Sequence, residues 1–477
     1  MVNNRRFNDK EPAFGIRHLQ CALIFFGQAV AYMLRVNMSV SIVAMTDKTT
    51  NSDFDVFTWS EKTKSLILSS FFWGYVITQV PAGQLAQRYG AKLVLFWGIT
   101  ICSVLAILTP VCARLGGSPL VCTLRVIQGL CQGCLLPSTH NLISKWAPVA
   151  ERGRLGTISY SGGQFGTALM LCISGELAAS IMGWPSTFYF PGGVGIIWAI
   201  LWYFFSSSSP AESHLISEDE RLYIEMIPAN GVPNKINDEK KPKLVTPWKE
   251  IWTSCPFYVL LFVHCANNWG FWTLLIEIPT YLKNVIGMDI KNSALLSSLP
   301  YWVMFLLSYF FLFLSEILDK KKGRDLAFSR KFFNSMGHWV QMLGLIGLGY
   351  VDGNNPTIAV ALLTLTVGMN ASCYLGFLIN HIDLSPNFAG TLMGITNGIA
   401  NIMSIFAPLT VGVIVDDEKD PAQWRIIFLI AASFFFVGNL MFVIFGKCET
   451  QPWNEPKITD EKNKLNGHNT VNVEAQQ

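Results

Sequence analysis

The chain alternates between long apolar runs and short polar segments. The runs reach about 20 residues, the length of an α-helix that crosses the hydrocarbon core of a bilayer. Because they are continuously apolar rather than alternating, they predict helices and exclude a transmembrane β-barrel. Twelve spans are expected, at about 17–45, 64–86, 92–113, 119–144, 156–181, 185–205, 255–284, 294–317, 332–351, 357–380, 388–415 and 424–446.

The polar segments divide these spans into two sets of six. The predicted fold class is therefore an all-α polytopic membrane protein with twelve transmembrane helices in two six-helix bundles. We expect, in chain order, a cytosolic tail, a first bundle, a cytosolic linker, a second bundle and a second cytosolic tail. Their boundaries are 1–16, 17–205, 206–254, 255–446 and 447–477.

Composition and charge agree with a membrane protein and give its orientation. Hydrophobic residues make up 51% of the chain and charged residues 14%, against about 25% charged in a soluble domain. Basic residues gather after the fourth span, at Lys145, Arg152 and Arg154, and after the eighth, around Lys320 and Arg330. The positive-inside rule then places both termini in the cytosol.

Two arginines, Arg35 and Arg125, fall inside predicted spans. Each guanidinium is permanently charged and costs about 2.5–3.5 kcal/mol at a helix centre on insertion scales. Holding an anion is the natural use of such charges. The alternative is a structural role, in which one arginine pairs with Glu176 or with backbone carbonyls. Gln132 lies about two helical turns after Arg125, so both side chains can line one cavity.

The two predicted bundles resemble each other. Span four contains Thr123-Leu124-Arg125-Val126 and span ten contains Thr364-Leu365-Thr366-Val367, and each span ends near a proline that is followed by a Gly-Thr pair. Such a repeat is typical of two-bundle transporters with a central site. Because Thr366 takes the place of Arg125, the positive charge is confined to the first half.

Other side chains are candidates for coupling or contact. Glu277 lies two residues before Pro279, and a buried carboxylate near unwound backbone could bind a cation or a proton. A position near the outer water layer is the alternative. Glu176 could face the outer half of the cavity, and Tyr75 could donate its hydroxyl to the anion or simply pack. The cysteines lie mostly in apolar spans, so no metal site is expected.

One stretch, Gly83-Gln84-Leu85-Ala86-Gln87-Arg88-Tyr89-Gly90, resembles the signature of the major facilitator superfamily between spans two and three. The resemblance implies a gating or structural role for Gly83, Arg88 and Gly90, with Asp319 as the acidic counterpart in the second half. Gln87 stands where the signature has an aspartate, which weakens the expectation of gating through that acid.

A further set of stretches recurs over nearly the whole chain. They are Arg35-Val36-Asn37-Met38-Ser39-Val40, Phe71-Phe72-Trp73-Gly74-Tyr75, Lys145-Trp146-Ala147-Pro148, Glu151-Arg152, Asn268-Trp269-Gly270-Phe271-Trp272, Leu295-Leu296-Ser297-Ser298-Leu299-Pro300, Asn380-His381-Ile382-Asp383 and Leu392-Met393-Gly394-Ile395. As a set they are similar to the solute carrier 17, or anion:cation symporter, family, and most like its insect inorganic phosphate cotransporters.

This resemblance implies roles for single residues. Arg35 and Arg125 match arginines that bind the substrate's anionic group. Gln132 matches a glutamate of the proton-coupled members, and Asn267 stands where the glutamate transporters have an arginine. These departures argue against glutamate as substrate. His381 belongs to a matching loop, which implies a gating or structural role.

The expected function is secondary active transport of inorganic phosphate or small organic anions, by cation-coupled symport and alternating access. Na⁺ or H⁺ is the expected coupling ion, with no other cofactor, no enzymatic activity, no nucleic acid and no obligate protein partner. Neither tail carries a clear dileucine-type sorting signal, which favours the plasma membrane. The alternatives are an organic-anion carrier driven by the membrane potential, for urate, acidic sugars or aromatic acids, and a non-transporting membrane receptor.

Overall fold

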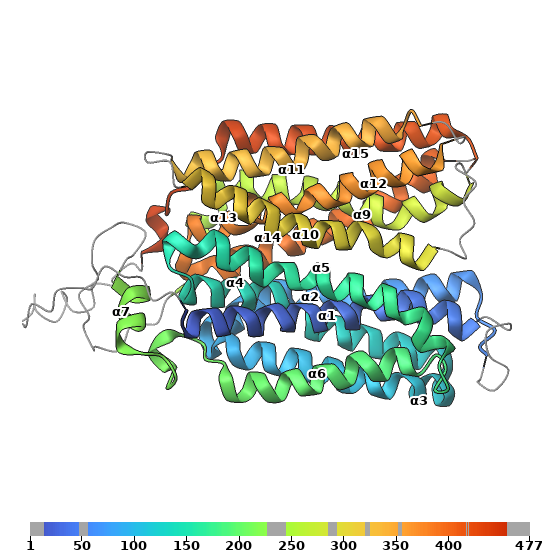
Figure 1. Ribbon diagram of the computed structural model, residues 1–477, viewed down its shortest axis with the longest axis horizontal. Helices are drawn as coiled ribbons and strands as arrows, with labels where there is room; N and C mark the ends of the chain where they lie inside the picture. Colours follow the sequence, from blue (N-terminus) through green and yellow to red (C-terminus); the bar gives the residue numbers. More distant parts are fainter. Residues whose placement is uncertain are drawn as a thin grey trace, which may run out of the picture.

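The computed structural model describes residues 14–46, 56–226, 245–284, 293–319, 325–351, 355–415, 417 and 419–455. Within these ranges the chain is helical and contains no strand. The helices form two halves that lie side by side, the first below the second in Figure 1. The first half holds α1 (Ile16–Thr46), α2 (Glu61–Tyr89), α3 (Ala91–Gln132), α4 (Leu135–Trp146), α5 (Arg152–Ala179) and α6 (Ser186–Phe205).

Two short helices, α7 (Glu218–Met226) and α8 (Trp248–Trp252), connect the halves. The second half holds α9 (Cys255–Asn284), α10 (Ser293–Asp319), α11 (Leu326–Leu348), α12 (Pro356–Met369), α13 (Phe377–Leu384), α14 (Ala389–Ile414) and α15 (Pro421–Phe445). Short 3-10 turns are η1 (Val149–Glu151), η2 (Pro210–Glu212), η4 (Asn370–Tyr374), η5 (Pro386–Phe388) and η6 (Pro452–Asn454).

We call the end of the molecule where α1 begins and α7 lies the α7 end (left in Figure 1). Glu220 of α7 accepts a hydrogen bond from the backbone N–H of Ile16, at the start of α1. Asn454, close to the last described residue, accepts one from Ser385 beside α13. The first and last described parts of the chain therefore lie at the same end.

Seven segments of the described chain are long and apolar enough to cross a membrane. They are Ile16–Thr46, Lys62–Tyr89, Ala91–Trp146, Ser186–Phe205, Ser298–Leu318, Pro356–Leu384 and Pro421–Phe445. The segment Ala91–Trp146 contains two of the spans expected from the sequence, because the backbone turns at Gly117 (φ 56°, ψ −150°), a conformation that glycine adopts without a steric penalty. The helices α5, α9, α11 and α14 are not among the seven and instead carry buried polar side chains.

The two expected spans that resemble each other are both broken. The first is interrupted between α3 and α4 at Gly133 and Cys134, and the second between α12 and α13 by η4. Gly133 packs against α2, where an added Cβ would lie 2.8 Å from the carbonyl oxygen of Tyr75. Interrupted helices at matching places in two repeats are typical of transporter binding sites.

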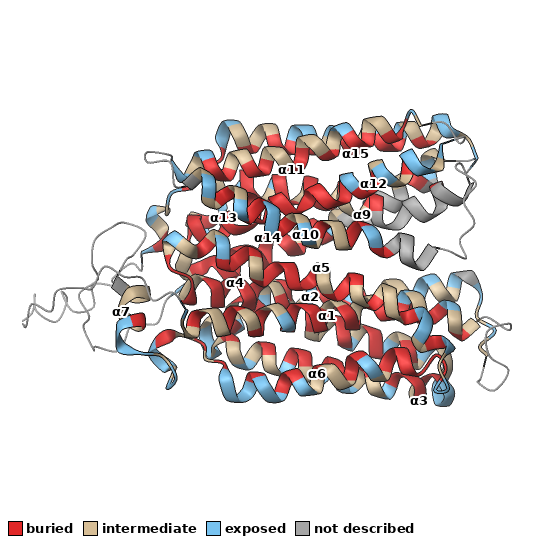
Figure 2. Cartoon of the chain, in the orientation of Figure 1, coloured by how far each residue is buried: buried red, intermediate tan, exposed pale blue. Residues whose placement is uncertain are grey.

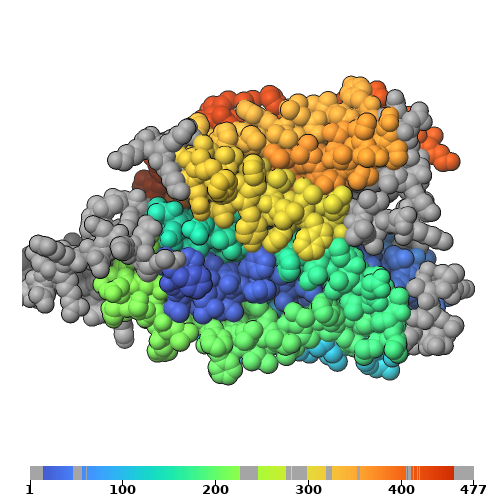
Figure 3. All heavy atoms as spheres, in the orientation of Figure 1, coloured from blue at the N-terminus to red at the C-terminus, as the bar shows by residue number. Residues whose placement is uncertain are grey.

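The halves meet mainly along three helix pairs of the described chain. The helix α5 packs along α10, and α14 packs against α2 and α4; the α5–α10 side is visible in Figure 3. Figure 2 places most buried positions along this junction, whereas α6 exposes much of its outer face.

The α2–α14 contact is made by backbone. A Cβ added to Gly83 would lie 2.7 Å from the carbonyl oxygen of Gly390, and one added to Gly394 would lie 2.5 Å from that of Gln79. These distances are shorter than any van der Waals contact, so the crossing requires glycine.

Candidate functional site

The two arginines predicted from the sequence converge in the first half. Arg35 on α1 is half-buried, and Arg125 on α3 is 4% exposed. Arg125 donates a hydrogen bond from Nη2 to the backbone carbonyl oxygen of Arg35, over 3.4 Å. This contact is of the kind expected if an arginine had a structural role, namely a hydrogen bond to a backbone carbonyl oxygen. It uses only one nitrogen of Arg125 and none of the guanidinium nitrogens of Arg35.

Aromatic rings cover the two guanidiniums. The ring of Phe71 lies near both, with its centroid 5.2 Å from Cζ of Arg35 and 4.7 Å from Cζ of Arg125. The rings of Tyr32 and Tyr75 lie 4.8 and 4.6 Å from Cζ of Arg35. Each contact contributes about 0.5–2 kcal/mol through the ring quadrupole, which offsets part of the desolvation cost without neutralising either charge.

Two glutamines of α3 hold the guanidiniums by hydrogen bonds. Gln132 accepts from Nε of Arg35 over 3.3 Å and donates to the carbonyl oxygen of Ala31 over 3.0 Å. Gln128 accepts from Nη1 of Arg125 over 3.2 Å. From the sequence we expected Gln132 to line a cavity together with Arg125. In the structure its hydrogen-bond partner is Arg35. Sequence reasoning missed Gln128, although its i+3 spacing from Arg125 places it on the same helix face.

No carboxylate of a described residue pairs with either guanidinium. The described carboxylates that are buried, Glu220 and Asp383, lie at the α7 end. Nη2 of Arg35 and Nε of Arg125 are buried and make no hydrogen bond to the described part of the chain. A buried charge without a counter-ion is strongly unfavourable, so this arrangement is suited to binding an anion.

Polar side chains of the second half approach the site. Nδ2 of Asn397 on α14 donates to the hydroxyl of Tyr75 over 3.2 Å, which links the two halves beside Arg35. Asn267 lies in a separate cluster, where its side-chain oxygen accepts from Asn370 over 2.8 Å; Asn370 also donates to Gln341 over 3.3 Å. Asn370 is the first residue of η4, which breaks the helix after α12, and Gln132 is the last residue of α3, directly before the corresponding break in the first half. Both polar clusters therefore lie next to a helix break.

Neither of the acids predicted for coupling, Glu176 and Glu277, is among the described side chains beside the arginines. Glu176 is exposed near the end of α5, so its side chain does not belong to the buried cluster. The side chains of Glu277 and Asp319 lie outside the described residues. A groove of about 320 Å³ between α3 and α6 is lined by Phe96, Tyr203 and other largely apolar side chains. It contains neither arginine and is not the candidate site.

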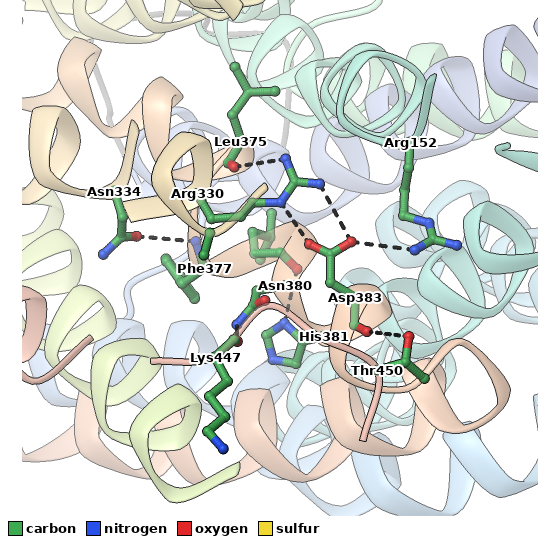
Figure 4. A network of polar contacts seen from close by, with 12 residues as sticks. Arg152, Arg330, Asn334, Leu375, Phe377, Asn380, His381, Asp383, Lys447 and Thr450 are labelled. Atoms are coloured by element: carbon green, nitrogen blue, oxygen red, sulfur yellow. Dashed lines mark hydrogen bonds and ion pairs between the residues drawn. The ribbon is translucent and has the colours of Figure 1, made fainter. Parts of the chain in front are cut away.

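Carboxylates and arginines pair at the α7 end. Asp383 on α13 accepts from Nε of Arg330 on α11 over 2.7 Å and from Nη1 of Arg152 on α5 over 3.4 Å (Figure 4). Arg152 belongs to the first half, so this ion pair crosses the junction. Arg17 pairs with Glu151 over 2.7 Å and with Glu220 over 3.0 Å.

Three of the residues predicted for gating or structural roles, Gly83, Arg88 and Gly90, lie in the last turns of α2 or directly after it. Gly83 forms the close α2–α14 crossing. Gly90 has φ 88° and lies between α2 and α3, which requires a conformation that glycine favours. Arg88 is exposed, with Cζ 5.4 Å from the ring of Tyr89.

His381 lies in a buried group of three histidines at the junction. Its Nε2 hydrogen-bonds with Oγ1 of Thr396 over 2.7 Å, and Nδ1 of His264 contacts the same hydroxyl over 3.1 Å. His140, from the first half, hydrogen-bonds with the carbonyl oxygen of Leu378 over 3.0 Å and with Tyr160 over 2.6 Å. His381 is therefore part of the contact between the halves.

Comparison with known proteins identifies the family. The sequence profile of the Major Facilitator Superfamily matches residues 24–408. A Drosophila ananassae protein named "Putative inorganic phosphate cotransporter" is 40% identical, over 94% of this chain and 96% of its own length. Human sialin is 34% identical, over 92% and 90%, and vesicular glutamate transporter 1 of Xenopus tropicalis is 34% identical, over 94% and 78%. The chain therefore belongs to the major facilitator superfamily and, within it, to the solute carrier 17 (anion:cation symporter) family.

Proposed function

We propose that this protein is a secondary active transporter of small anions that works by alternating access. The observation that carries the proposal is the pair of buried guanidiniums, Arg35 and Arg125, without a carboxylate partner among the described residues. An exchangeable anion would supply the missing counter-charge. The names of the relatives support inorganic phosphate or a small organic anion as substrate.

The proposed topology has twelve membrane crossings, with the α7 end and both chain termini in the cytosol. Ala91–Trp146 turns at Gly117 and counts as two crossings, so the seven apolar segments account for eight. The helices α5, α9, α11 and α14 supply the other four. Basic residues near the α7 end, such as Lys145 and Arg154, support the orientation by the positive-inside rule.

The driving force is proposed to be a cotransported cation, Na⁺ or H⁺. Moving one net negative charge against 100 mV costs about 2.3 kcal/mol, so uptake into a cell that is negative inside needs a compensating cation. Glu277 is the proposed acid for this coupling. The competing proposal is a carrier driven by the membrane potential, and vesicular transporters are among the relatives.

The two driving forces separate in proteoliposomes when Na⁺, pH and voltage are varied one at a time. Uptake that stops without Na⁺ or without a proton gradient supports symport. Uptake that does not depend on Na⁺ or on the proton gradient but changes with the membrane potential supports the potential-driven carrier. We propose the plasma membrane as the location, which surface biotinylation in the native cell checks.

Uptake of labelled phosphate and organic anions by arginine variants tests the site. We expect Arg35→Gln and Arg125→Gln each to reduce uptake by at least about tenfold, because each removes one charge from a buried site. Arg114→Gln is the matched control, since Arg114 is an exposed residue of the same helix α3. Normal uptake in both site variants at equal protein levels would reject the assignment.

A further inference from the structure

The protein holds its buried arginines in two chemically different ways. At the α7 end, Arg17, Arg152 and Arg330 are paired with the carboxylates Glu151, Glu220 and Asp383. In the candidate site, Arg35 and Arg125 are instead hydrogen-bonded by the amides of Gln132 and Gln128.

An amide orients a guanidinium but leaves its charge intact. A carboxylate fixes the geometry equally well and also cancels the charge. Both glutamines are nearly fully buried, at 3% exposure for Gln128 and 2% for Gln132. Both lie on α3, so one helix orients both guanidiniums, and the site retains a formal charge of two.

Nothing else described around the site removes this charge. The side chains that cover the guanidiniums are the uncharged rings of Tyr32, Phe71 and Tyr75. Gln132 also contacts the thiol of Cys102, over 3.5 Å. Each guanidinium keeps one buried N–H nitrogen without a partner in the described chain, Nη2 of Arg35 and Nε of Arg125.

We propose that Gln128 and Gln132 are specificity-determining residues that make the site selective for doubly charged anions over singly charged anions of the same shape. The proposal rests on the proposed function and adds the charge of the substrate to it. A dianion neutralises the site, whereas a monoanion leaves one buried charge uncompensated. Inorganic phosphate in its dianionic form fits this class, and a monocarboxylate does not.

Sulfate and methanesulfonate form a matched pair of probes. Both are tetrahedral at sulfur and similar in size, and they carry two and one negative charges across the working pH range. Binding to the purified full-length protein is measured by the rise in thermal midpoint with anion concentration, because a ligand of the folded state stabilises by mass action. We expect sulfate to bind at least about tenfold more tightly than methanesulfonate. Equal affinities would overturn the proposal.

Variants of the glutamines assign the selectivity to these residues. Gln132→Glu and Gln128→Glu each add one negative charge beside a guanidinium, and we expect the sulfate preference to fall at least about threefold in each. Gln132→Leu removes the amide without adding charge, so it should weaken both anions and keep their ratio. If the anion does not bind beside these two positions, the Glu variants keep the ratio of the parent protein.

The outcomes separate this proposal from the proposed function. An unchanged ratio in Glu variants that still bind sulfate would overturn the specificity role, even if transport is normal. If one Glu variant does not fold, the other variant and the parent protein still decide the question. A clear sulfate preference in a protein that moves no anion in proteoliposomes would uphold the charge selectivity and reject transport.

Discussion

At the scale of single residues, the site depends on how permanent charge is buried. The ring of Phe71 lies near the guanidiniums of both Arg35 and Arg125. It contributes attraction without a counter-charge, so the two cations can stay close together while their charge remains available to the proposed anion. The amide oxygens of Gln128 and Gln132 act in the same way.

Replacing Phe71 by leucine tests this role. Phe71→Leu keeps an apolar side chain but removes both cation–π contacts, so we expect the free energy of unfolding of the anion-free protein to fall by about 1–2 kcal/mol. Saturating sulfate should restore part of the loss, because the anion supplies the missing counter-charge. Phe96→Leu, also a phenylalanine replacement on a helix of the first half, should show no sulfate-dependent rescue. Thermal unfolding with and without sulfate measures both, and equal rescue in the two variants would contradict the role.

The sequence predicted the arginines but not their partners. A permanently charged residue inside an apolar run is expensive wherever the helix packs, so Arg35 and Arg125 could be identified without coordinates. The partner of Gln132 depends on how α1 packs against α3, and helix periodicity alone placed it with Arg125. Glu176 is exposed, and its expected place in the outer half of the cavity stays a prediction.

At the scale of elements, the crossing of α2 and α14 decides how closely the halves approach. Gly390 and Gly394 lie four residues apart on α14, so both face the first half along the same side of this helix. Gly390 lies against Pro137 and Gly83, and Gly394 lies against Gln79. Because backbone touches backbone, no neighbouring side chain can rotate to make space for an added methyl group.

Adding one methyl group at this crossing should therefore separate the helices. We expect Gly83→Ala and Gly390→Ala each to destabilise the protein by about 1–3 kcal/mol and to lower the maximal transport rate. Gly193→Ala in α6 is the control, since an added Cβ there has no atom within 4 Å and alanine favours the helix. Thermal midpoints and uptake rates are the measurements. Tolerance of the first two substitutions would mean that the crossing is not a tight contact in the membrane.

At the scale of the whole molecule, ion pairs between described residues link the halves in two different surroundings. Arg152 and Asp383 are buried, at side-chain exposures of 5% and 2%. Arg154 on α5 and Glu316 on α10 lie 3.5 Å apart but are 51% and 42% exposed. Desolvation makes the buried pair sensitive to loss of either partner, while solvent screens the exposed pair.

Neutralising one acid in each pair should have very different effects. Asp383→Asn leaves both Arg152 and Arg330 without their carboxylate, so we expect a loss of about 3–5 kcal/mol and a weaker contact at the α7 end. Glu316→Gln should cost no more than about 1 kcal/mol. Thermal unfolding of the two variants in one detergent compares them directly, and losses of similar size would show that the buried network does not hold the halves together.

The sequence by itself determined the class of protein, the repeat and the two intramembrane charges, because each follows from the cost of placing backbone and charge in hydrocarbon. The twelve spans and the cytosolic termini remain predictions from the same principle. Only the tertiary structure decided that the arginines meet around Phe71, that neutral amides hold them, and that Asp383 joins the halves. These contacts link residues far apart in the chain, and they depend on helix rotation and crossing geometry, which hydrophobic periodicity does not specify.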